Sequence, residues 1–583
     1  MPGFAEILRG LSPEQEAACQ APENVLLTAC PGSGKTRTLT RRLAYQAAQE
    51  PASKKWNVAI TFTNRAADEI ASRLDDMGID LSSIWTGTIH QFCMQFIIRP
   101  YAMYSRRLSK GYFIIDEYTQ REYGRNIAKD LGMQLSSFDD PFQYRAVVTA
   151  YEALLAANKE IDFEMILRFS AELSSRCPFI CSNIAAVINS VLVDEFQDTN
   201  ELQYSILAKI YKADKSINLM FVGDVNQAIY GSLGGVAKSK AELDALYETT
   251  FKEMSLTGCY RSTDRVVNLY RNFEVCETSV CSVAEFKDAA GTINYCRSVS
   301  KDNLTGEIAA IIRSELVSGT PAEEICVLAP QWQILFSLSR NLRSQLPEVL
   351  FDAPDISPIK YDPLNPLYLL ARLLFMPSGE NVSIRKRIAT EFISIIRDDL
   401  KIMLPDKIQN YDILSAVNHC RTLDADGIVC LKAVIKRVFS LLRIDVNKEK
   451  ALPCLTERFF DKIDFRVKQY SLPTDYDSIS RYFRDKQGVV ISTIHGVKGE
   501  EYTTVIAVCL LNGYLPHWDF IIKPEKKPFR KTETSKLLYV LCSRAKQNLY
   551  LFSETERKTN KGSEYTPTDE LSLIAHNLSL SGT

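Results

Sequence analysis

The stretch that most constrains this chain is LLTACPGSGKTRTL, in which an apolar run gives way to Pro-Gly-Ser-Gly and then Lys-Thr. Glycines let backbone N–H groups close around phosphate oxygens, while Lys and Ser/Thr serve the terminal phosphates and Mg²⁺. The simpler alternative is an ordinary strand-to-helix turn, and Ala29 stands where the full pattern has Gly. The flanks favour a phosphate-binding loop, because residues 24–29 are typical of a short buried strand and residues 37–43 of a helix.

Length and composition limit the classes of protein that remain. A chain of 583 residues is too long for one hydrophobic core and predicts about three or four domains. With 71 acidic and 69 basic residues, any nucleic-acid binding needs a local groove. Fifteen cysteines without a C-x-x-C pair argue against disulfides, zinc and iron–sulfur clusters. We expect a cytoplasmic protein without membrane contact, since no signal-like N-terminus or long apolar run is present.

The order of strand and helix patterns predicts an α/β fold. Strand-like runs NVLLTA, NVAITFT and SIWTGT alternate with helical patterns over the first 100 residues, as in a parallel sheet. Residues 101–182 are typical of helices with no repeated strands, and strands resume at SVLVDE and NLMFVGD. A second set, EICVLA, GVVISTI, TTVIAVCLL and NLYLF, is interrupted by a largely helical stretch. We therefore predict two parallel-sheet domains, each interrupted by a mostly helical insertion.

The other half of a nucleotide site follows later in the chain. A phosphate-binding loop needs one carboxylate for Mg²⁺ and another for the attacking water, and SVLVDEFQDT supplies Asp194 and Glu195 at a strand end. The next strand places Gln227 just beyond the sheet edge, where an amide can sense a γ-phosphate. Arginine meets the charge that develops on the transferred phosphoryl group, and Arg261 and Arg544 are the candidates.

In this order the motifs resemble those of superfamily 1A DNA helicases of the UvrD/Rep/PcrA type. The resemblance spans roughly residues 11–552 and includes LSPEQEAA, TFTNRAADEI, GTIHQF, DEFQDT, VGDVNQAIYG, LTGCYRST, ISTIHGVKGEEY and YVLCSRAK. It implies two RecA-like P-loop NTPase domains with ATP between them and single-stranded DNA across both. The implied divisions are 1–100 with 186–258 for the first RecA-like domain, 101–185 for its insertion, 259–375 with 478–583 for the second, and 376–477 for its insertion.

The resemblance also implies the nucleotide contacts, with ATP and Mg²⁺ as cofactors. Thr36 and Asp194 would hold the metal, and Glu195 would act on water. The γ-phosphate would meet Gln227 and the two arginines. The implied catalytic residues are Lys35, Asp194, Glu195, Gln227, Arg261 and Arg544, and the implied ATP contacts are Gln15 and Tyr260 at adenine, Glu501 at the ribose, and Gly32, Ser33, Gly34, Lys35, Thr36 and Arg37 at the phosphates.

A further set of residues is implied to contact the DNA strand. Aromatic rings stack on any base, while hydroxyls, imidazoles and ammonium groups position phosphates. A simpler interpretation of Phe62 is a core residue at a strand end. The implied DNA contacts are Phe62, Thr63, Thr88, His90, Tyr230, His495 and Lys498.

The chain departs from the family pattern mainly at the DNA track. Ser232 and Leu233 replace a stacking Trp and its Arg. Because stacking contributes about 1–3 kcal/mol per base, this loss would weaken the coupling between ATP turnover and stepping without touching hydrolysis. Cys259 replaces an Asn, and Glu500 stands where the family prefers Leu. Both helical insertions are short for this family, and residues 376–477 lack a Gly-x-Gly hairpin of the kind that grips duplex backbone, so the sequence does not predict unwinding of long duplexes.

Three functions remain open from the sequence. The first is an ATP-driven 3′-to-5′ translocase or helicase on single-stranded or tailed DNA, in DNA processing or anti-phage defence. The second is a DNA- or nucleotide-sensing regulatory ATPase that controls a partner nuclease. The helicase-like subunit of the Gabija anti-phage system, which acts beside an OLD-family nuclease, is the analogy for it. The third, an inactive scaffold, is disfavoured by the intact catalytic set.

Overall fold

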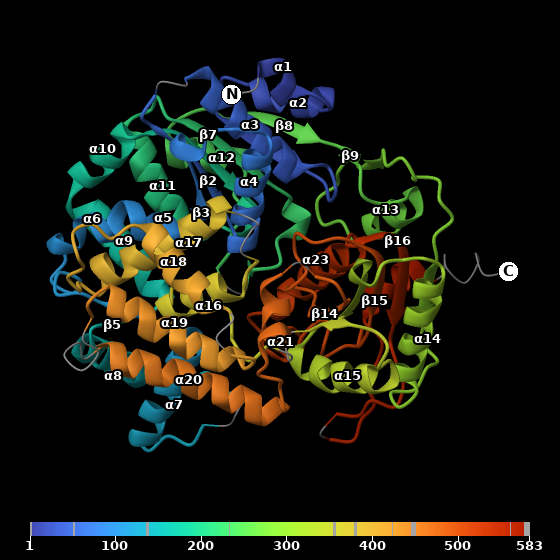
Figure 1. The fold of residues 1–583 in the computed structure, drawn as a ribbon. Coiled ribbons are helices and arrows are strands. Elements are labelled where there is room, and N and C mark those ends of the chain that lie inside the picture. The colour runs from blue at the N-terminus through green and yellow to red at the C-terminus, as the bar shows by residue number, and fades with distance from the viewer. Residues whose placement is uncertain are drawn as a thin grey trace.

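The chain contains two parallel β-sheets, which lie in different halves of the molecule (Figure 1). The computed structural model describes residues 3–50, 53–135, 139–231, 234–353, 357–377, 382–421, 424–444, 451–484, 486–559 and 561–575. Within these residues each sheet has six strands, and all paired strands run parallel. The predicted α/β fold class with two parallel sheets is confirmed.

The first sheet has the strand order β3-β2-β6-β7-β1-β8. Its inner strands are apolar runs buried on both faces, as expected where helices cover a parallel sheet. Its strands are β1 (Val25–Ala29), β2 (Trp56–Thr61), β3 (Ile84–Thr88), β6 (Ile188–Asp194), β7 (Asn218–Gly223) and β8 (Lys252–Leu256), and its helices are α1 (Phe4–Leu8), α2 (Pro13–Gln20), α3 (Lys35–Gln49), α4 (Asn64–Asp76), α11 (Glu201–Ala213) and α12 (Lys240–Tyr247).

A first helical group is inserted between β3 and β6 and shares its core with the first sheet. The sequence predicted a mostly helical segment with no repeated strands, and the structure adds one short parallel pair, β4 (Phe113–Ile114) with β5 (Glu160–Ile161). Two-residue strands are too short to leave an alternating pattern. The helices are α5 (Ile89–Phe92), α6 (Arg99–Tyr101), α7 (Glu117–Asp130), α8 (Arg145–Asn158), α9 (Phe163–Arg176) and α10 (Pro178–Ala186).

The second sheet has the strand order β11-β16-β15-β12-β14-β13. The four predicted strands are its central ones, and the two edge strands are short. Its strands are β11 (Ile293–Cys296), β12 (Ile325–Ala329), β13 (Phe351–Asp352), β14 (Val489–Thr493), β15 (Tyr502–Ala507) and β16 (Ala545–Phe552); with it go α13 (Asp264–Arg271), α14 (Leu304–Val317), α15 (Trp332–Gln345), α22 (Trp518–Ile522), α23 (Arg530–Cys542) and the short pair β9 (Gly258–Cys259) and β10 (Cys281–Ser282).

A second helical group lies between β13 and β14 and has a core of its own. That core begins at Ile359, so it includes α16, whose sequence PLYLLARLLF is apolar apart from Arg372 and which packs against α17, α18 and α19. The predicted start at residue 376 placed α16 with the second sheet instead. The helices are α16 (Pro366–Phe375), α17 (Val382–Ser394), α18 (Asn410–His419), α19 (Gly427–Leu441), α20 (Ala451–Tyr470) and α21 (Tyr476–Ser480).

Buried ion pairs hold the second helical group against the first. The Arg99 guanidinium lies 2.7 Å from the Glu391 carboxylate and 2.9 Å from that of Asp399, and the Tyr112 hydroxyl donates to Asp399 at 2.7 Å. The side chains of Arg99 and Asp399 are almost fully buried, so each charge depends on its partner. This contact fixes where α17 lies relative to the first sheet.

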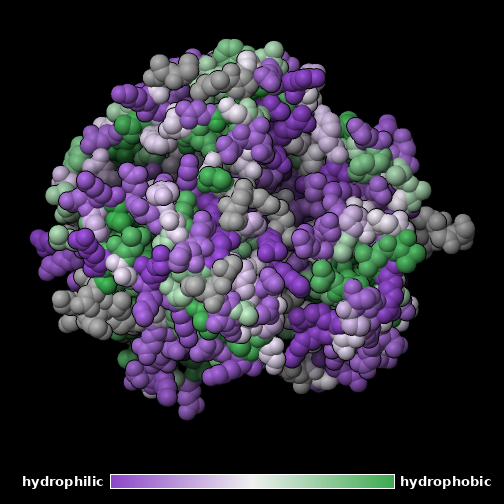
Figure 2. Space-filling view, viewed as in Figure 1, coloured by the Kyte–Doolittle hydropathy of each residue, from purple (hydrophilic) through white to green (hydrophobic). Residues whose placement is uncertain are grey.

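Figure 2 shows one face of the molecule as mostly hydrophilic, with small and separate hydrophobic patches. Among the helices that the structure describes, none combines the length and apolar character needed to cross a bilayer.

Candidate functional site

The phosphate-binding loop connects β1 to α3. Helix α3 begins at Lys35, with Gly34 as its N-cap residue. The free N–H groups and dipole of a helix N-terminus favour an anion, so the loop has the geometry for a phosphate. The Ser33 N–H and hydroxyl both donate to the Cys30 carbonyl, at 3.2 and 2.7 Å, which fixes the curvature of the loop. The predicted loop residues therefore lie together at the carboxyl edge of the first sheet.

Two glycines let other segments approach this loop closely. Gly32 and Gly34 have positive φ angles of 73° and 80°. A Cβ atom on Gly32 would lie 2.4 Å from the Arg261 Cβ, and one on Gly34 would lie 2.7 Å from the Gln15 amide nitrogen. The Tyr260 N–H donates to the Gly32 carbonyl at 2.9 Å. The loop thus contacts the residues predicted for adenine and for the γ-phosphate.

The Gln15 amide is held at both ends. Ser12 and Gln15 form a capping box at the start of α2, in which the Ser12 N–H donates to the Gln15 Oε1 at 3.0 Å. The Gln15 Nε2 donates to the Ser33 carbonyl at 2.9 Å, and the side chain is buried. This fixes the amide beside the phosphate loop, and its contact with adenine stays a prediction.

Two adjacent carboxylates, the last residue of β6 and the one after it, have pKa values shifted in opposite directions. Burial, followed by the charge of Glu195, raises the pKa of Asp194 to about 7. Burial acts to raise the pKa of Glu195 too, but Lys35 and Lys498 outweigh it, so that pKa lies below its ordinary value. The Gln197 amide also donates to the Glu195 carboxylate at 2.5 Å. Neighbouring groups with divergent pKa values suit different tasks in one site.

The Asp194 environment fits a divalent cation. Its carboxylate accepts a hydrogen bond from the Glu195 N–H at 3.1 Å, and its burial disfavours the ionised form unless a cation is near. Mg²⁺ usually binds through one or two carboxylates together with nucleotide phosphates and waters. Thr36, the second residue of α3, adds a hydroxyl from the loop. The donor set therefore fits Mg²⁺ with a nucleotide.

Arg544 reaches from the second sheet to the first. Its side chain is 1% exposed, and its Nη2 donates to the Gln227 Oε1 at 2.9 Å. The Gln227 Nε2 in turn donates to the Asp224 carboxylate, after β7, at 2.7 Å. Burial and the charge of Arg261 lower the pKa of Arg544 to about 9. A chain of hydrogen bonds therefore joins the two sheets beside the phosphate loop.

Arg261 and Glu501, predicted for opposite ends of ATP, contact each other. The Arg261 Nε donates to the Glu501 carboxylate at 2.6 Å, and its Nη1 donates to the Ser543 carbonyl at 3.0 Å. Burial would raise the pKa of Glu501, but Arg261 outweighs it and lowers that pKa. The Tyr260 ring nearby is exposed and free to stack. The pair lies close to the loop, with Arg261 packed against Gly32.

Lys498 follows β14 and contacts the first sheet in the cleft, by which we mean the region beside the phosphate loop where groups from the two sheets meet. Its ammonium donates to the Asp198 carboxylate at 2.5 Å and to the Gln227 carbonyl at 2.7 Å. It also lies 5.1 Å from the centroid of the Tyr230 ring. Burial raises the pKa of Asp198 to about 7, although Lys498 acts against this. The predicted DNA contact thus bridges the two sheets, and its role on DNA stays a prediction.

Three predicted DNA contacts form a cluster of rings. The Phe62 and Tyr230 rings stack with centroids 4.5 Å apart, and the Tyr230 and His495 rings lie 5.5 Å apart. These residues follow β2, β7 and β14, so both sheets contribute. Phe62 is 41% exposed, which is more than a core residue allows. The cluster lies where the carboxyl edges of the sheets meet.

The remaining predicted DNA contacts lie beside helix starts. Thr63 and Thr88 are N-caps of α4 and α5, and each hydroxyl accepts the backbone N–H three residues later, at 3.2 and 3.4 Å. His90 lies within α5, where its ring packs edge-on against Phe163, and burial lowers its pKa to about 4. Its imidazole is therefore neutral at pH 7. Ser232 and Leu233 lie outside the described residues.

The sequence did not predict an ion-pair bridge around Glu500. The Glu500 carboxylate accepts from the Lys486 ammonium at 2.5 Å and also contacts Arg65 and the Tyr502 hydroxyl. Arg65 lies on α4, so this group also joins the two sheets. The sequence sign of this ion-pair group was Glu500 itself, which stands where the family prefers Leu. Asp198 and Asp224, which lacked a predicted role, share the signal of a carboxylate just after a strand.

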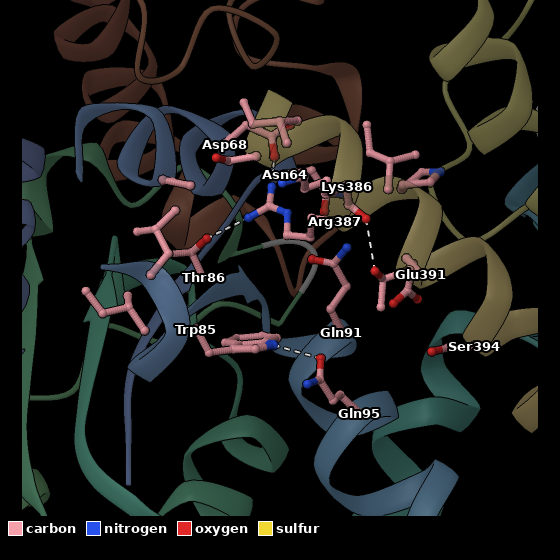
Figure 3. A pocket seen from close by; sticks show the side chains of 18 of the residues that line it. Asn64, Asp68, Trp85, Thr86, Gln91, Gln95, Lys386, Arg387, Glu391 and Ser394 are labelled. Carbon is pink, nitrogen blue, oxygen red and sulfur yellow. Dashed lines mark hydrogen bonds and ion pairs between the residues drawn. The ribbon is translucent and has the colours of Figure 1, made fainter. Parts of the chain in front are cut away.

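A pocket of about 870 Å³ lies apart from this cleft (Figure 3). Trp85 and Thr86 of β3 line one side, and Arg387 and Glu391 of α17 line the other. Arg387 donates to the Thr86 hydroxyl at 2.7 Å and pairs with Asp68 of α4. None of the predicted nucleotide residues is among those described as lining it. The pocket belongs to the interface between the first sheet and the second helical group.

Comparison with known proteins agrees with this arrangement. The model of the UvrD/REP helicase N-terminal domain matches residues 11–147 and 136–245, and that of the UvrD-like helicase C-terminal domain matches residues 455–556. The ATP-dependent DNA helicase PcrA of Bacillus subtilis is 24% identical over 94% of this chain and 83% of its own length. The proteins of that name from Staphylococcus epidermidis and Staphylococcus aureus are 23% identical over 94% of this chain and 84% of theirs. The two models together span more than half of the chain, in the order of its motifs, and the chain belongs to the UvrD/REP helicase family.

Proposed function

We propose that this protein is an ATP-dependent DNA helicase or translocase that moves 3′ to 5′ along single-stranded or tailed DNA. The observation that carries the proposal is the bond from Arg544 to Gln227, because it unites two sheets around one phosphate loop. The PcrA relatives are named as ATP-dependent DNA helicases, which supports the same activity. The 3′-to-5′ direction rests on family resemblance.

In this proposal each residue at the phosphates has a separate task. Lys35 and the N-terminus of α3 would bind the terminal phosphates, and Thr36 and Asp194 would hold Mg²⁺. When bound, Mg²⁺ neutralises the charge that develops on the phosphate oxygens. Glu195 keeps a low pKa and accepts the proton of the attacking water. Gln227, fixed by Asp224, faces the γ-phosphate.

The two arginines couple hydrolysis to the relation between the sheets. Arg544 is bonded to Gln227 and Arg261 to Glu501, and a γ-phosphate competes for both guanidinium groups. When hydrolysis removes the γ-phosphate, each arginine returns to its protein partner. ATP and ADP therefore favour different openings of the cleft. Lys498, which contacts both Asp198 and the Tyr230 ring, passes this change to the DNA-facing rings.

The test measures ATP hydrolysis with and without single-stranded DNA, and displacement of a strand from duplexes with a 3′ or a 5′ tail. We expect stimulation by single strands and displacement with the 3′ tail only. Displacement with the 5′ tail alone would reverse the direction. Absence of stimulation by any single strand would contradict the proposal.

A second function is favoured by Ser232 and Leu233, which replace the stacking Trp and its Arg. In it the chain is a DNA- or nucleotide-sensing ATPase that controls a partner nuclease of the OLD-family type, in anti-phage defence. The two functions give different results in the same assay. Strong stimulation without strand displacement supports a translocating or sensing subunit, and full unwinding by the protein alone supports the helicase.

A further inference from the structure

An exposed tryptophan begins α15. The Trp332 side chain is 40% exposed, although Trp usually buries most of its ring. Its ring stacks with that of Phe336, one turn later, at 6.5 Å and 29° between planes. Phe336 in turn stacks with Tyr470, at the end of α20, at 5.7 Å and 24°. Three aromatic rings therefore form a row whose first member faces solvent.

Cationic side chains accompany these rings. The Arg466 guanidinium lies 5.6 Å from the centroid of the Tyr470 ring. Arg340 follows Phe336 by one further helical turn and is exposed. Helical spacing places Trp332, Phe336 and Arg340 on one side of α15. Exposed rings beside arginines are the combination that binds single strands without sequence preference.

The row begins at the sheet edge that already carries predicted DNA contacts. Ala329, the last residue of β12, is the register partner of Thr493, the last residue of β14. Neighbouring strands lie about 4.8 Å apart. Trp332 comes three residues after Ala329, and His495 two residues after Thr493. Trp332 therefore lies just beyond the same sheet edge as His495. It follows β12, and His495 follows the neighbouring strand β14.

A path of aromatic rings thus crosses from one sheet to the other. Phe62, Tyr230 and His495 form its part in the cleft, with ring spacings of 4.5 and 5.5 Å. Trp332 follows β12, whose last residue is the register partner of the last residue of β14, so its ring begins at the next strand along the same edge. A single strand that passes over the cleft reaches β12 next, because β12 and β14 are adjacent in the sheet.

We infer that Trp332, supported by Phe336 and Tyr470, is a stacking platform for an unpaired base of single-stranded DNA. The inference rests on the proposed function, since the strand must follow the edges of both sheets. The platform gives the second sheet a base-stacking contact. This is the kind of contact that is lost where Ser232 and Leu233 replace the stacking Trp and its Arg. Phe336 and Tyr470 act through Trp332 by holding the plane of its indole.

Binding and fluorescence together test the platform. Single-strand affinity is measured with labelled oligo(dT) for the wild type, Trp332→Ala and Trp332→Phe. We expect Trp332→Ala to bind about tenfold more weakly or worse, and Trp332→Phe to stay within a few-fold of the wild type, because a phenyl ring still stacks. Tyr411→Ala, an exposed aromatic on α18, is the matched control and keeps full affinity.

Tryptophan emission supplies a readout that a purely structural role would not move. The chain has four tryptophans, and stacking on a base quenches the one that makes the contact. Oligo(dT) should quench the wild type, and Trp332→Phe should bind while losing most of that quenching. Trp518→Phe, which removes another partly exposed indole, should retain it.

The outcomes separate this inference from the proposed function. Absence of single-strand binding by the wild type would overturn both. Wild-type binding, with full affinity in Trp332→Ala or with unchanged quenching in Trp332→Phe, would overturn the platform alone. The fluorescence comparison decides the matter even if Trp332→Ala fails to fold.

Discussion

The nucleotide cleft and the DNA-facing edge are made of different kinds of side chain. The cleft is made of buried polar and charged groups that already have partners, such as Arg544 on Gln227 and Lys498 on Asp198. The edge is made of partly exposed rings that contact one another, such as Phe62 on Tyr230. A phosphate needs preorganised charges in a site that excludes water, whereas a moving strand needs contacts that form and break.

The difference also shows where the two regions are joined. Lys498 bonds to Asp198 in the cleft and lies over the Tyr230 ring at the edge. A change in cleft opening therefore moves a charge that lies against the aromatic cluster. Substitutions in the cleft should abolish turnover, and those at the edge should weaken its dependence on DNA.

The largest effect should come from Glu195→Gln. Glutamine cannot accept the proton of the attacking water, and general bases contribute roughly a hundredfold to ten-thousandfold. We expect kcat for ATP to fall by about a thousandfold while ATP binding persists, measured by phosphate release and by nucleotide titration. In contrast, Lys35→Ala should lose binding as well.

The matched control for that change is Glu253→Gln, on the exposed part of edge strand β8. It should keep the wild-type rate, because it makes the same chemical change far from the phosphate loop. A normal rate in Glu195→Gln would remove Glu195 from the reaction.

Arg544→Lys should have the next largest effect. Arg544 donates to Gln227, to the Glu500 carbonyl and to the Ser543 hydroxyl through one planar group, which an ammonium cannot reproduce. We expect kcat to fall roughly a hundredfold, the typical cost of one preorganised donor, measured at saturating DNA.

Arg271→Lys, at the exposed end of α13, is the control for that change. If Arg544→Lys kept its rate and lost only stability, the bond between the sheets would be structural, and the contrast with the edge would be weaker.

The sequence predicted the inner part of each sheet better than its edges. Inner strands such as β12, which reads ICVLA, are apolar runs because both of their faces are buried. Three of the four edge strands lack that pattern: β8 reads KEMSL and is largely exposed, β13 has two residues and β11 has four, whereas the fourth, β3, was predicted from SIWTGT. Helix α16 was assigned to the second sheet because its apolar pattern does not say which core it joins.

The candidate site divides in the same way. Motif residues that follow a strand, such as Asp194 and Gln227, could be placed at the sheet edge by sequence alone. The partners of Lys498 and Glu500 could not, because they depend on how two sheets separated by hundreds of residues lie together. The local sequence pattern predicts which residues lie at a sheet edge, and only tertiary packing determines which residues face them.

Phe62→Ala tests the edge and should act on DNA binding more than on chemistry. Loss of one stacking ring costs about 1–3 kcal/mol, so the DNA concentration for half-maximal ATPase stimulation should rise by roughly tenfold. Phe4→Ala is the matched control, because Phe4 is also exposed and packs on a tyrosine, Tyr45. Equal effects of the two variants would mean that Phe62 is a packing residue.

The smallest expected effect is on how the free energy of unfolding depends on pH, measured for the protein free of Mg²⁺ and nucleotide. Burial raises the pKa of Asp194 to about 7, so the folded cleft keeps a proton that the unfolded chain releases near pH 4. Stability from this group is complete below about pH 4 and is lost as the pH rises towards 7, by at most about 1.4 kcal/mol per pH unit. His90 at the edge behaves oppositely: burial lowers its pKa to about 4, so its contribution is present above about pH 6.5 and is lost as the pH falls towards 4.

Two variants separate these opposing slopes. Free energies of unfolding in urea, measured from pH 4.5 to 7, should fall less steeply with rising pH in Asp194→Asn than in the wild type. His90→Gln should shift the slope the other way, because it removes a group that stabilises the fold as the pH rises. Mg²⁺ with a non-hydrolysable ATP analogue should erase the Asp194 difference and leave the His90 difference, since only the cleft residue would lie against the cation. Parallel curves for both variants would mean that burial does not set the protonation of either group, and the contrast between a charged cleft and an aromatic edge would then rest on geometry alone.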